Sequence, residues 1–330
     1  MAADRRPVLV APDSFKGTLS SREVAEAVGR GLEDEGIATD LMALADGGEG
    51  TMAILLEALG GETIEVDAHD ALMRPLKAKV AVDVGEAGTA VVETAQAIGL
   101  PLVAEGERDP EGASSFGAGE LVLAAVEAGA KRVIVAVGGS ATTDGGAGAI
   151  EAIEAGGGTG GAKLTVCCDA QTPFERAAIV FGPQKGADEE CVRRLTGRLE
   201  QQAAALPRDP TGEPMTGAAG GLAGGLWAAF GAELTGGAGF VLDALDADRR
   251  MRAARAVVVG EGRLDLTTLE GKAAGELAVR ARQAGVPAFA VVGQDGLDLL
   301  DRRILDLQAV IEAGDARELR AAGRRLAAYL

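Results

Sequence analysis

The sequence predicts an α/β protein with two domains: a main domain built on a parallel sheet, and a second α/β domain inserted into it. Three observations lead to this prediction. Buried strands alternate with helices at both ends of the chain, short β-rich runs interrupt this rhythm in the middle, and 330 residues exceed the usual length of one compact domain. Strands that alternate with helices form parallel sheets, because each crossover lays a helix against a face of the sheet.

The N-terminal segments keep this alternation. The apolar run 7–11 (PVLVA) predicts a buried strand, and Ser20 with Glu23 forms a capping box that predicts the start of a helix ending near residue 35. The run 39–44 predicts a second strand, and the apolar segment 52–59 predicts a second helix. Together these segments make the strand–helix–strand unit with which a parallel sheet begins.

The rhythm changes between residues 62 and 100. Short β-rich runs separated by turn residues predict a hairpin-rich segment there. Helical periodicity returns from Phe116, and buried strands are expected at 132–139 and 163–169. A helix that is polar on one side is expected at 188–205.

The strand–helix pattern is complete again at the C-terminal end. Strands are expected at 254–265 and 288–293, and helices near 272–284 and 316–329. The change of rhythm near residue 66 and its return near residue 252 indicate the domain boundaries. We therefore predict a discontinuous Rossmann-like domain of residues 1–66 and 253–330, and an inserted α/β domain of residues 67–252.

The composition argues against several classes of function. The formal net charge of −18 and the aromatic content of 3% argue against a nucleic-acid-binding protein, which needs a basic face or stacking side chains. The sole histidine, His69, indicates neither a histidine-rich metal site nor a Ser–His–Asp triad. Three cysteines, no signal peptide and no apolar run long enough to span a bilayer predict a soluble cytoplasmic protein.

Polar, glycine-rich segments follow several of the predicted strands. Ligands of open α/β sheets bind at the carboxyl ends of strands, so these segments are the candidates for a binding site. Their shared residues suit phosphoryl transfer: glycine lets backbone N–H groups approach a phosphate, lysine offers a positive charge, and aspartate can hold Mg²⁺ or accept a proton. The segments are 11–18, 45–51, 137–148, 167–174, 181–187 and 259–272.

The lysines strengthen this interpretation. A chain of charge −18 repels anions overall, so an anion site must be locally positive. Of the seven lysines, Lys16, Lys185 and Lys272 lie in glycine-rich segments. Simpler explanations stay open for each segment taken alone, since Asp13 can cap a turn, and Arg263, Asp265 and Lys272 can form a surface ion network.

Taken in order, the motifs resemble those of the bacterial class I glycerate kinases, the glycerate 2-kinase family. The resemblance runs from Pro12 to Lys272, and it implies two α/β domains with the active site in the cleft between them. It also implies phosphorylation of D-glycerate by ATP and Mg²⁺ to 2-phospho-D-glycerate. Thr172 and Thr267 depart from the Asn and Gln usual in the family. The motifs are PDSFKGTLSS, ADGGEGT, VGGSATTDGGAG, Cys168–Asp169, FGPQKGA, GAAGGL and GEGRLD with T-L-x-G-K.

Under this hypothesis the charged residues of the glycine-rich segments form a catalytic set. Lys16 and Lys185 are expected to stabilise phosphoryl charge. Asp46, Asp144 and Asp169 are the candidates for general base and Mg²⁺ ligand, with Asp144 and Asp169 named for the metal. The sequence does not divide the two roles among them.

The predicted binding residues come from the same segments. A planar guanidinium fork suits a carboxylate, so Arg263 is expected to hold the carboxylate of the substrate. Backbone N–H groups and hydroxyls are expected to cradle phosphates. The substrate-binding residues are Asp13, Ser14, Arg263 and Asp265. The ATP- or phosphate-binding residues are Gly138, Gly139, Ser140, Thr142 and Lys272.

Two alternatives remain open beside the 2-kinase. The first is a glycerate kinase that makes 3-phosphoglycerate. The second is a non-catalytic sensor that binds a sugar acid on the same scaffold, which the departures at Thr172 and Thr267 leave open. The expected partners are D-glycerate and ATP, with no nucleic acid and no membrane, and a homo-oligomer is left open.

Overall fold

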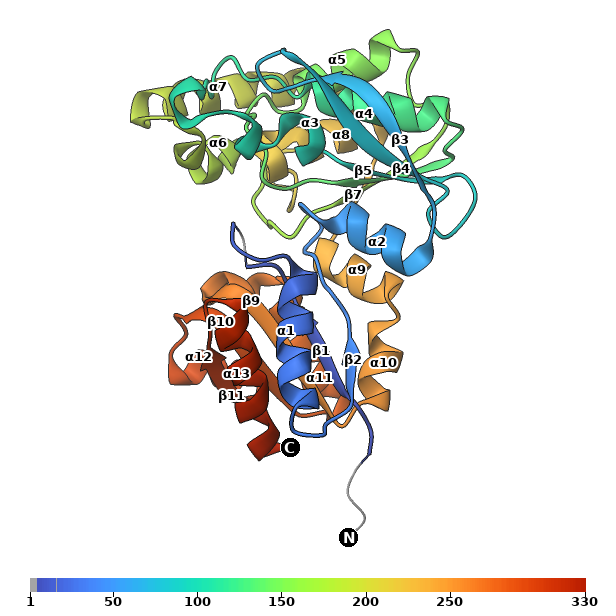
Figure 1. The fold of residues 1–330 in the computed structure, drawn as a ribbon. Helices are drawn as coiled ribbons and strands as arrows, with labels where there is room; N and C mark the ends of the chain where they lie inside the picture. Colours follow the sequence, from blue (N-terminus) through green and yellow to red (C-terminus); the bar gives the residue numbers. More distant parts are fainter. Residues whose placement is uncertain (1–4, 16) are drawn as a thin grey trace. The chain divides into compact units, whose positions relative to one another are not determined.

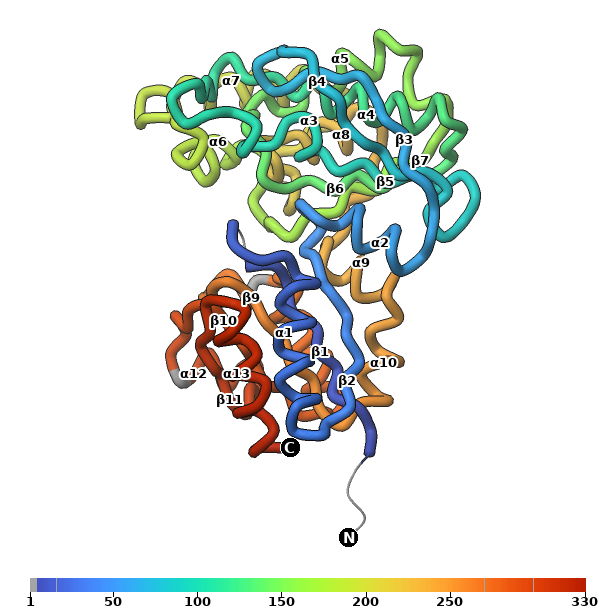
Figure 2. Tube along the Cα trace, viewed as in Figure 1, coloured from blue at the N-terminus to red at the C-terminus, as the bar shows by residue number. Residues whose placement is uncertain are grey.

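The computed structural model describes residues 5–15 and 17–330 (Figure 1 and Figure 2). The chain divides into two compact units: the first unit is Met1–Asp46 with Ala238–Leu330, and the second unit is Gly47–Gly237. Each unit is a sheet covered by helices, so the predicted α/β class is confirmed. In the described residues no helix is both long and apolar enough to cross a membrane. The predicted catalytic residue Lys16 lies outside the described residues.

The first unit is built on a five-stranded sheet in the order β11-β10-β9-β1-β2, in which every neighbouring pair is parallel. Two of its internal strands, β1 and β9, are apolar and buried along most of their length, as expected for strands covered on both faces. The strands are β1 (Val8–Pro12), β2 (Thr39–Leu41), β9 (Ala256–Leu264), β10 (Ala288–Asp295) and β11 (Leu307–Glu312). The helices are α1 (Ser21–Glu33), α9 (Gly237–Ala244), α10 (Ala247–Ala253), α11 (Ala273–Ala284), α12 (Leu299–Ile304) and α13 (Ala316–Leu326), with short 3-10 helices at Leu266–Glu270 and Ala327–Tyr329.

Strand β2 is shorter than the run 39–44 predicted. The strand ends at Leu41, although the N–H groups of Met42 and Leu44 still donate to the carbonyl oxygens of Val10 and Pro12. Helix α1 begins as predicted, because the Ser20 hydroxyl accepts from the Glu23 N–H and the Glu23 carboxylate accepts from the Ser20 N–H.

The strand order of the first unit places a topological switch point between β1 and β9. From β1 the chain crosses to β2 on one side, whereas β9 leads to β10 and β11 on the other side. The connections therefore diverge at the carboxyl ends of β1 and β9, and such a divergence opens a crevice in an open α/β sheet.

Helices α1 and α13 pack through a pair of glycines. A Cβ atom added to Gly31 would lie 2.1 Å from the carbonyl oxygen of Arg320, and one added to Gly323 would lie 2.2 Å from that of Val28. Two ion pairs extend the contact, since Arg320 and Arg324 both lie within 2.8 Å of the Asp34 carboxylate. The glycines therefore set how closely the two helices approach each other.

The second unit is built on a six-stranded mixed sheet in the order β3-β4-β5-β6-β7-β8. The first three strands are antiparallel and the pairs from β5 to β8 are parallel, so the expected hairpin is confirmed for β3 and β4. The strands are β3 (Glu62–His69), β4 (Pro75–Val82), β5 (Thr89–Glu93), β6 (Arg132–Ala136), β7 (Lys163–Cys167) and β8 (Glu233–Thr235). The helices are α2 (Thr51–Leu59), α3 (Ala95–Ile98), α4 (Phe116–Glu127), α5 (Ala147–Ala155), α6 (Ala177–Phe181), α7 (Glu189–Ala205) and α8 (Leu222–Phe230), with short 3-10 helices at Leu100–Leu102, Glu105–Glu107, Phe174–Arg176, Pro183–Lys185 and Ala218–Gly221.

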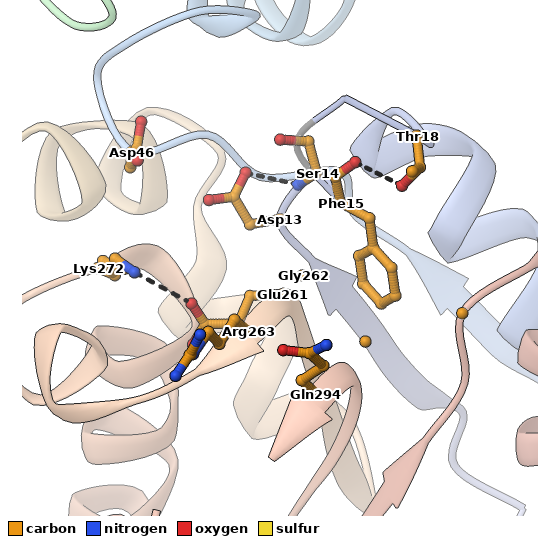
Figure 3. Close-up of a pocket in the computed structure, with 12 residues that line it drawn as sticks. Asp13, Ser14, Phe15, Thr18, Asp46, Glu261, Gly262, Arg263, Lys272 and Gln294 are labelled. Atoms are coloured by element: carbon orange, nitrogen blue, oxygen red, sulfur yellow. Dashed lines mark hydrogen bonds and ion pairs between the residues drawn. The ribbon is translucent and has the colours of Figure 1, made fainter. Parts of the chain in front are cut away.

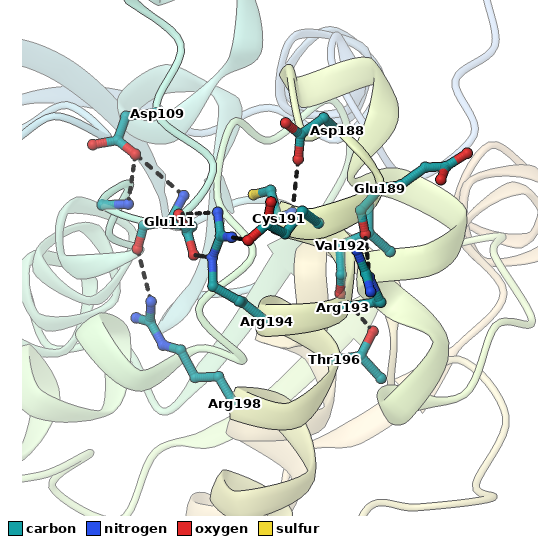
Figure 4. Close-up of polar contacts among 12 residues, drawn as sticks. Asp109, Glu111, Asp188, Glu189, Cys191, Val192, Arg193, Arg194, Thr196 and Arg198 are labelled. Atoms are coloured by element: carbon teal, nitrogen blue, oxygen red, sulfur yellow. Dashed lines mark hydrogen bonds and ion pairs between the residues drawn. The ribbon is translucent and has the colours of Figure 1, made fainter.

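Helices α6 and α7 form a small helical lobe with a hydrophobic core of its own, centred on Phe174, Leu195 and Leu199. Figure 4 shows how a loop of the second unit is tied to this lobe. The Arg194 guanidinium donates to both carboxylate oxygens of Glu111, at 2.7 and 3.0 Å, and Arg198 donates to the Glu111 carbonyl oxygen at 2.7 Å. The lobe carries the segment Pro183–Lys185, so these contacts help to fix where Lys185 lies.

The boundaries between the two units differ from those predicted from the sequence. The boundaries fall after Asp46 and Gly237, whereas the change of sequence pattern predicts them after residues 66 and 252. Helix α2 belongs to the second unit because Glu93 holds its first turn, and α9 and α10 belong to the first because Arg280 forms ion pairs with both. These contacts join segments that are far apart in the sequence, so the local pattern of strands and helices does not predict them.

Candidate active site

A hollow of about 430 Å³ lies at the carboxyl edge of the sheet in the first unit (Figure 3). It is bounded by the segments that follow β1, by the end of β9 and by the end of β10, so it coincides with the topological switch point. Five of the predicted site residues line it. The lining residues are Asp13, Ser14, Phe15, Thr18, Asp46, Glu261, Gly262, Arg263, Lys272, Gly293, Gln294 and Gly314.

The segment after β1 forms one wall of this hollow and is held by its own contacts. Asp13 is buried and its Oδ1 accepts from the Ser14 N–H at 2.6 Å. The ring of Phe15 is buried in the core, and its carbonyl oxygen accepts from the Thr18 hydroxyl at 2.8 Å. The wall is therefore a compact turn anchored by Phe15, with Ser14 and Thr18 at the hollow.

A chain of four charged groups of alternating sign forms the opposite wall. Arg263 lies 3.6 Å from Asp265, Asp265 lies 3.8 Å from Lys272, and Lys272 lies 3.6 Å from Glu261. Burial opposes a low pKa at Asp265, but the Thr267 hydrogen bonds and the Lys272 charge outweigh it and hold the pKa of Asp265 below its usual value. The separations exceed hydrogen-bond length, so these charges remain available to a ligand.

Asp265 also starts the 3-10 helix that follows β9. Its side chain accepts from the N–H and the hydroxyl of Thr267, and the Thr268 hydroxyl accepts from the Asp265 N–H in return. Thr267, which departs from the residue that the resemblance leads us to expect, thus bonds within its own turn. Asp265 therefore combines a capping role with a place in the charged wall.

In the second unit the glycine-rich loop after β6 crosses the carboxyl edge of the sheet. A Cβ atom on Gly138 would lie 2.9 Å from the Cα atom of Gly48, so the loop after β6 and the loop before α2 touch through their backbones. Gly139 has a left-handed φ of 62°. The hydroxyls of Thr142 and Thr143 are fully buried and have no hydrogen-bond partner among the described residues. Backbone crowding and unpaired hydroxyls fit a cradle that donates hydrogen bonds to phosphate oxygens.

The GAAGGL segment supports this loop from behind. A Cβ atom on Gly220 would lie 2.0 Å from the Thr142 carbonyl oxygen, and one on Gly225 would lie 2.4 Å from that of Gly145. These glycines therefore permit close packing of α8 and the turn before it against the loop.

Asp144 is held inside the fold. Its Oδ2 accepts from the N–H and the hydroxyl of Ser115, both at 2.8 Å, and from the Gly148 N–H at 3.1 Å. Its Oδ1 accepts from the Gly146 N–H at 3.2 Å, at the start of α5. A carboxylate has about four acceptor sites, so these four bonds leave little capacity for a metal ion or a substrate.

Lys185 is buried against the same loop. Its Nζ donates to the Ser140 hydroxyl at 3.2 Å and to the Thr142 carbonyl oxygen. Burial lowers the pKa of Lys185 to about 7, and the charge of Asp144 opposes this shift. The ammonium therefore holds the loop in shape, and 2% of the residue is exposed.

Asp169 lies two residues beyond the end of β7 and is half-buried. The two cysteines before it are fully buried, and burial raises the pKa of the Cys168 thiol to about 12, so neither is poised as a nucleophile. The described residues contain no group of three or more acids, cysteines or histidines placed to hold a metal. Mg²⁺ in phosphoryl-transfer sites usually takes one or two carboxylates together with the phosphates, and Asp169 fits such a role.

Three functional candidates were missed from the sequence. Glu93 ends β5 and accepts from the N–H groups of Gly50 and Met52 at the start of α2, and burial raises its pKa. Glu261 lies near the end of β9 and lines the hollow, while Ser115 bonds to Asp144. The two glutamates share a signal that can be read from the sequence, an acid near the carboxyl end of a buried strand. Ser115 has no such signal.

A parallel sheet with a charged hollow at its switch point, joined in one chain to a second sheet edged by glycine-rich loops, is typical of α/β enzymes that act on small anionic molecules. Residues 8–158 and 157–320 match the model of the glycerate kinase family. The chain belongs to the glycerate kinase family, and the family inferred from its motifs is confirmed.

Relatives across bacteria support the same assignment. The chain is 37% identical to the glycerate kinase of Bacillus subtilis (strain 168), over 88% of this chain and 86% of that one. It is 35% identical to the glycerate 2-kinase of Escherichia coli (strain K12), over 87% and 84%. The crystal structure of a protein of Salmonella typhimurium LT2 assigned as glycerate kinase 2 superposes with a TM-score of 0.82 at 31% identity, over 99% and 98% of the two chains.

Proposed function

We propose that this protein transfers the γ-phosphoryl group of ATP to D-glycerate and releases 2-phospho-D-glycerate. Membership of the glycerate kinase family supports the reaction class, and the relative named glycerate 2-kinase supports the 2-hydroxyl as the acceptor. The observation that carries the proposal furthest is the hollow of the first unit. There Arg263 and Lys272 stand beside hydroxyl groups in a chain whose net charge is −18, which is where an anionic hydroxy acid can bind.

We assign D-glycerate to this hollow. The Arg263 guanidinium is two-thirds exposed and loosely paired, so its planar fork is free to receive the substrate carboxylate. Ser14 and Thr18 on the facing wall offer hydrogen bonds to the substrate hydroxyls. Asp13 and Asp265 act on the substrate indirectly, by holding the turns from which Ser14 and Arg263 project.

We assign the phosphates of ATP to the loop Gly138–Thr143 of the second unit. The unpaired hydroxyls of Thr142 and Thr143 support this assignment, since a buried hydroxyl without a partner costs free energy until a ligand bonds to it. Lys185 keeps the loop in shape through Ser140 and Thr142. Catalysis then consists of positioning and charge stabilisation, as in other phosphoryl transfers.

We assign Mg²⁺ to Asp169, and we assign Asp144 a structural role. Asp169 offers a half-buried carboxylate, whereas the four hydrogen bonds to Asp144 already satisfy its oxygens. Asp169 would hold the Mg²⁺, whose charge would offset the negative charge that develops on the phosphates. The catalytic roles of Lys16 and Asp46 and the cytoplasmic location of the protein stay predictions from the sequence.

The test is an assay of ADP release from the purified protein with D-glycerate, ATP and Mg²⁺. Addition of enolase without phosphoglycerate mutase shows which hydroxyl is phosphorylated, because enolase consumes 2-phosphoglycerate. We expect ADP release and immediate consumption of the product. Product that enolase consumes only when the mutase is added would assign the 3-hydroxyl, and glycerate binding without ADP release would assign a sensor.

A further inference from the structure

Glu261 is a buried acid in the hollow that the mechanism above does not use. The residue is 5% exposed, and it is one of the residues that line the hollow. Figure 3 shows its carboxylate beside the Lys272 ammonium on the charged wall. An ionised side chain this deeply buried costs free energy unless it is paired, and a buried acid that lines a hollow is a candidate for a functional residue.

Two contacts orient the Glu261 carboxylate and leave it acceptor capacity. The Thr268 hydroxyl donates to Oε1 at 2.6 Å, and Lys272 Nζ lies 3.6 Å from Oε2. The Thr268 hydroxyl is itself fixed, because it accepts from the Asp265 N–H at 3.1 Å. A carboxylate has about four acceptor sites, so Glu261 can still accept a hydrogen bond from a ligand.

The position of Glu261 along β9 matches the length of a small hydroxy acid. Glu261 and Arg263 are two residues apart on one strand, so their side chains leave it on the same side, about 6.6 Å apart along the strand. A three-carbon acid whose carboxylate meets the Arg263 fork therefore has its hydroxyl groups within reach of Glu261.

Asp13 and Asp46 line the hollow, Asp265 lies beside it, and all three are less suited to accept a proton from a bound hydroxyl. Asp46 is only half-buried, so its carboxylate is less shielded from water than that of Glu261. The Asp13 carboxylate accepts from the Ser14 N–H, and this hydrogen bond stabilises the turn after β1. Asp265 caps the 3-10 helix after β9 and accepts from Thr267 twice. Glu261 combines burial, a fixed orientation and remaining acceptor capacity.

We propose that Glu261 is a catalytic residue that accepts the proton of the glycerate hydroxyl during phosphoryl transfer. The proposal rests on the proposed function. In the step, the hydroxyl O–H bond breaks and its proton moves to the Glu261 carboxylate, while the hydroxyl oxygen forms a bond to the γ-phosphorus. The bond between that phosphorus and the oxygen bridging it to the β-phosphorus breaks, and ADP leaves with the electron pair.

The electrostatic surroundings of Glu261 agree with this role. Burial raises its pKa, the Thr268 hydrogen bond and the Lys272 charge lower it, and the Asp265 charge raises it, with a net upward shift. Within the part of the chain that the structure describes, Arg263, Asp13 and Asp46 are the other charged groups that line the hollow. A carboxylate whose pKa is shifted upward toward the working pH is a more effective base than an exposed one.

The decisive experiment compares Glu261→Gln with the wild type in the ADP-release assay across pH. The glutamine side chain has nearly the same shape and its amide oxygen can accept from Thr268, but it cannot take a proton. We expect kcat to fall by about 100-fold or more with little change in KM for glycerate, and the acid limb of the kcat/KM profile to disappear. Glu261→Asp keeps a carboxylate, so it should retain the acid limb at a lower kcat.

The matched control is Glu312→Gln. Glu312 ends β11 at the same edge of the same sheet but does not line the hollow, so its kcat and pH profile should match the wild type. A folded Glu261→Gln enzyme whose kcat stays near the wild-type value, or a Glu261→Asp enzyme without an acid limb, overturns the inference and leaves the proposed function intact. A wild-type protein without turnover overturns the proposed function, and the inference with it.

Discussion

The two units place charged residues at the carboxyl edges of their sheets in opposite ways. In the first unit, Arg263 and Lys272 stand at a hollow with side chains 66% and 31% exposed, and their ion pairs are 3.6 to 3.8 Å long. In the second unit, Asp144 and Lys185 are 3% and 2% exposed, and both are bonded to the chain itself. Similar glycine-rich segments thus produce an open charged wall in one unit and a closed polar network in the other.

The difference shows that the role of a charged residue near a binding site depends on how fully its bonds are made within the fold. A fully buried charge must be satisfied within the fold, because otherwise its desolvation is uncompensated. A partly exposed charge is only loosely paired and can exchange its partner for a ligand. Under the proposed function, the buried Asp144 and Lys185 of the second unit therefore shape the phosphate cradle, while Arg263 and Lys272 of the first unit stay available to the substrate.

The largest expected effect comes from Asp144→Asn. The carboxamide nitrogen would face N–H or O–H donors, so buried hydrogen bonds to a charged acceptor are lost, and the free energy of unfolding should fall by about 3 kcal/mol or more. Urea unfolding followed by fluorescence of Trp227, the sole tryptophan, measures this in the second unit. Asp169→Asn is the companion variant. Its free energy of unfolding should match that of the wild type, but it should need a higher Mg²⁺ concentration for half-maximal activity. If Asp144→Asn instead has normal stability and needs a higher Mg²⁺ concentration for activity, Asp144 is a Mg²⁺ ligand and the structural role assigned to it is wrong.

The next effect is on the pH dependence of stability. Burial lowers the pKa of Lys185 from 10.5 to about 7, so between these values the unfolded chain binds more protons than the folded one. Stability therefore rises with pH through this window, by up to about 1.4 kcal/mol per pH unit, and the cost of burying the ammonium is complete below it. Lys185→Met should lack this rise, which urea unfolding of both proteins at several pH values shows. Equal slopes in the two proteins would mean that Lys185 is not desolvated.

A smaller effect is expected where α1 meets α13 in the first unit. Gly31→Ala places a methyl group against the Arg320 carbonyl oxygen, so the helices must separate, at a cost of about 1–3 kcal/mol. Gly197→Ala on α7 is the matched control, because no atom lies within 4 Å of the added Cβ. It should stabilise the protein by about 0.5–1 kcal/mol through helix propensity. Thermal unfolding by circular dichroism compares them, and equal effects would exclude close packing at Gly31.

The smallest effect on stability is expected at the open wall. Arg263→Met removes a loosely held, two-thirds exposed guanidinium, so the free energy of unfolding should change by less than about 1 kcal/mol. Its KM for glycerate should rise, because the hollow loses positive charge. A large loss of stability with unchanged KM would place Arg263 among the structural charges and remove the contrast between the two units.

The sequence by itself determined the α/β class, most of the strands and helices, the capping box at Ser20 and the family. The elements and the capping box depend on patterns within about ten to twenty residues. The family depends on motifs that can be read directly from the sequence. The location of the hollow in the first unit could also be predicted, because glycine-rich segments that follow strands indicate a binding site at the carboxyl edge of a sheet. Four of its lining residues, Asp13, Ser14, Arg263 and Lys272, were predicted as binding residues, and Asp46 as catalytic.

Only the tertiary structure decided which charged residues are bonded within the fold. Asp144 is satisfied by Ser115, 29 residues away, and Lys185 by Thr142, 43 residues away. Glu261 becomes a candidate catalytic residue because strand β9 ends at the switch point and Thr268 and Lys272 fold back onto it. The physical reason is the same in each case: burial and the partners of a charge are set by contacts between distant segments, and local sequence does not record them.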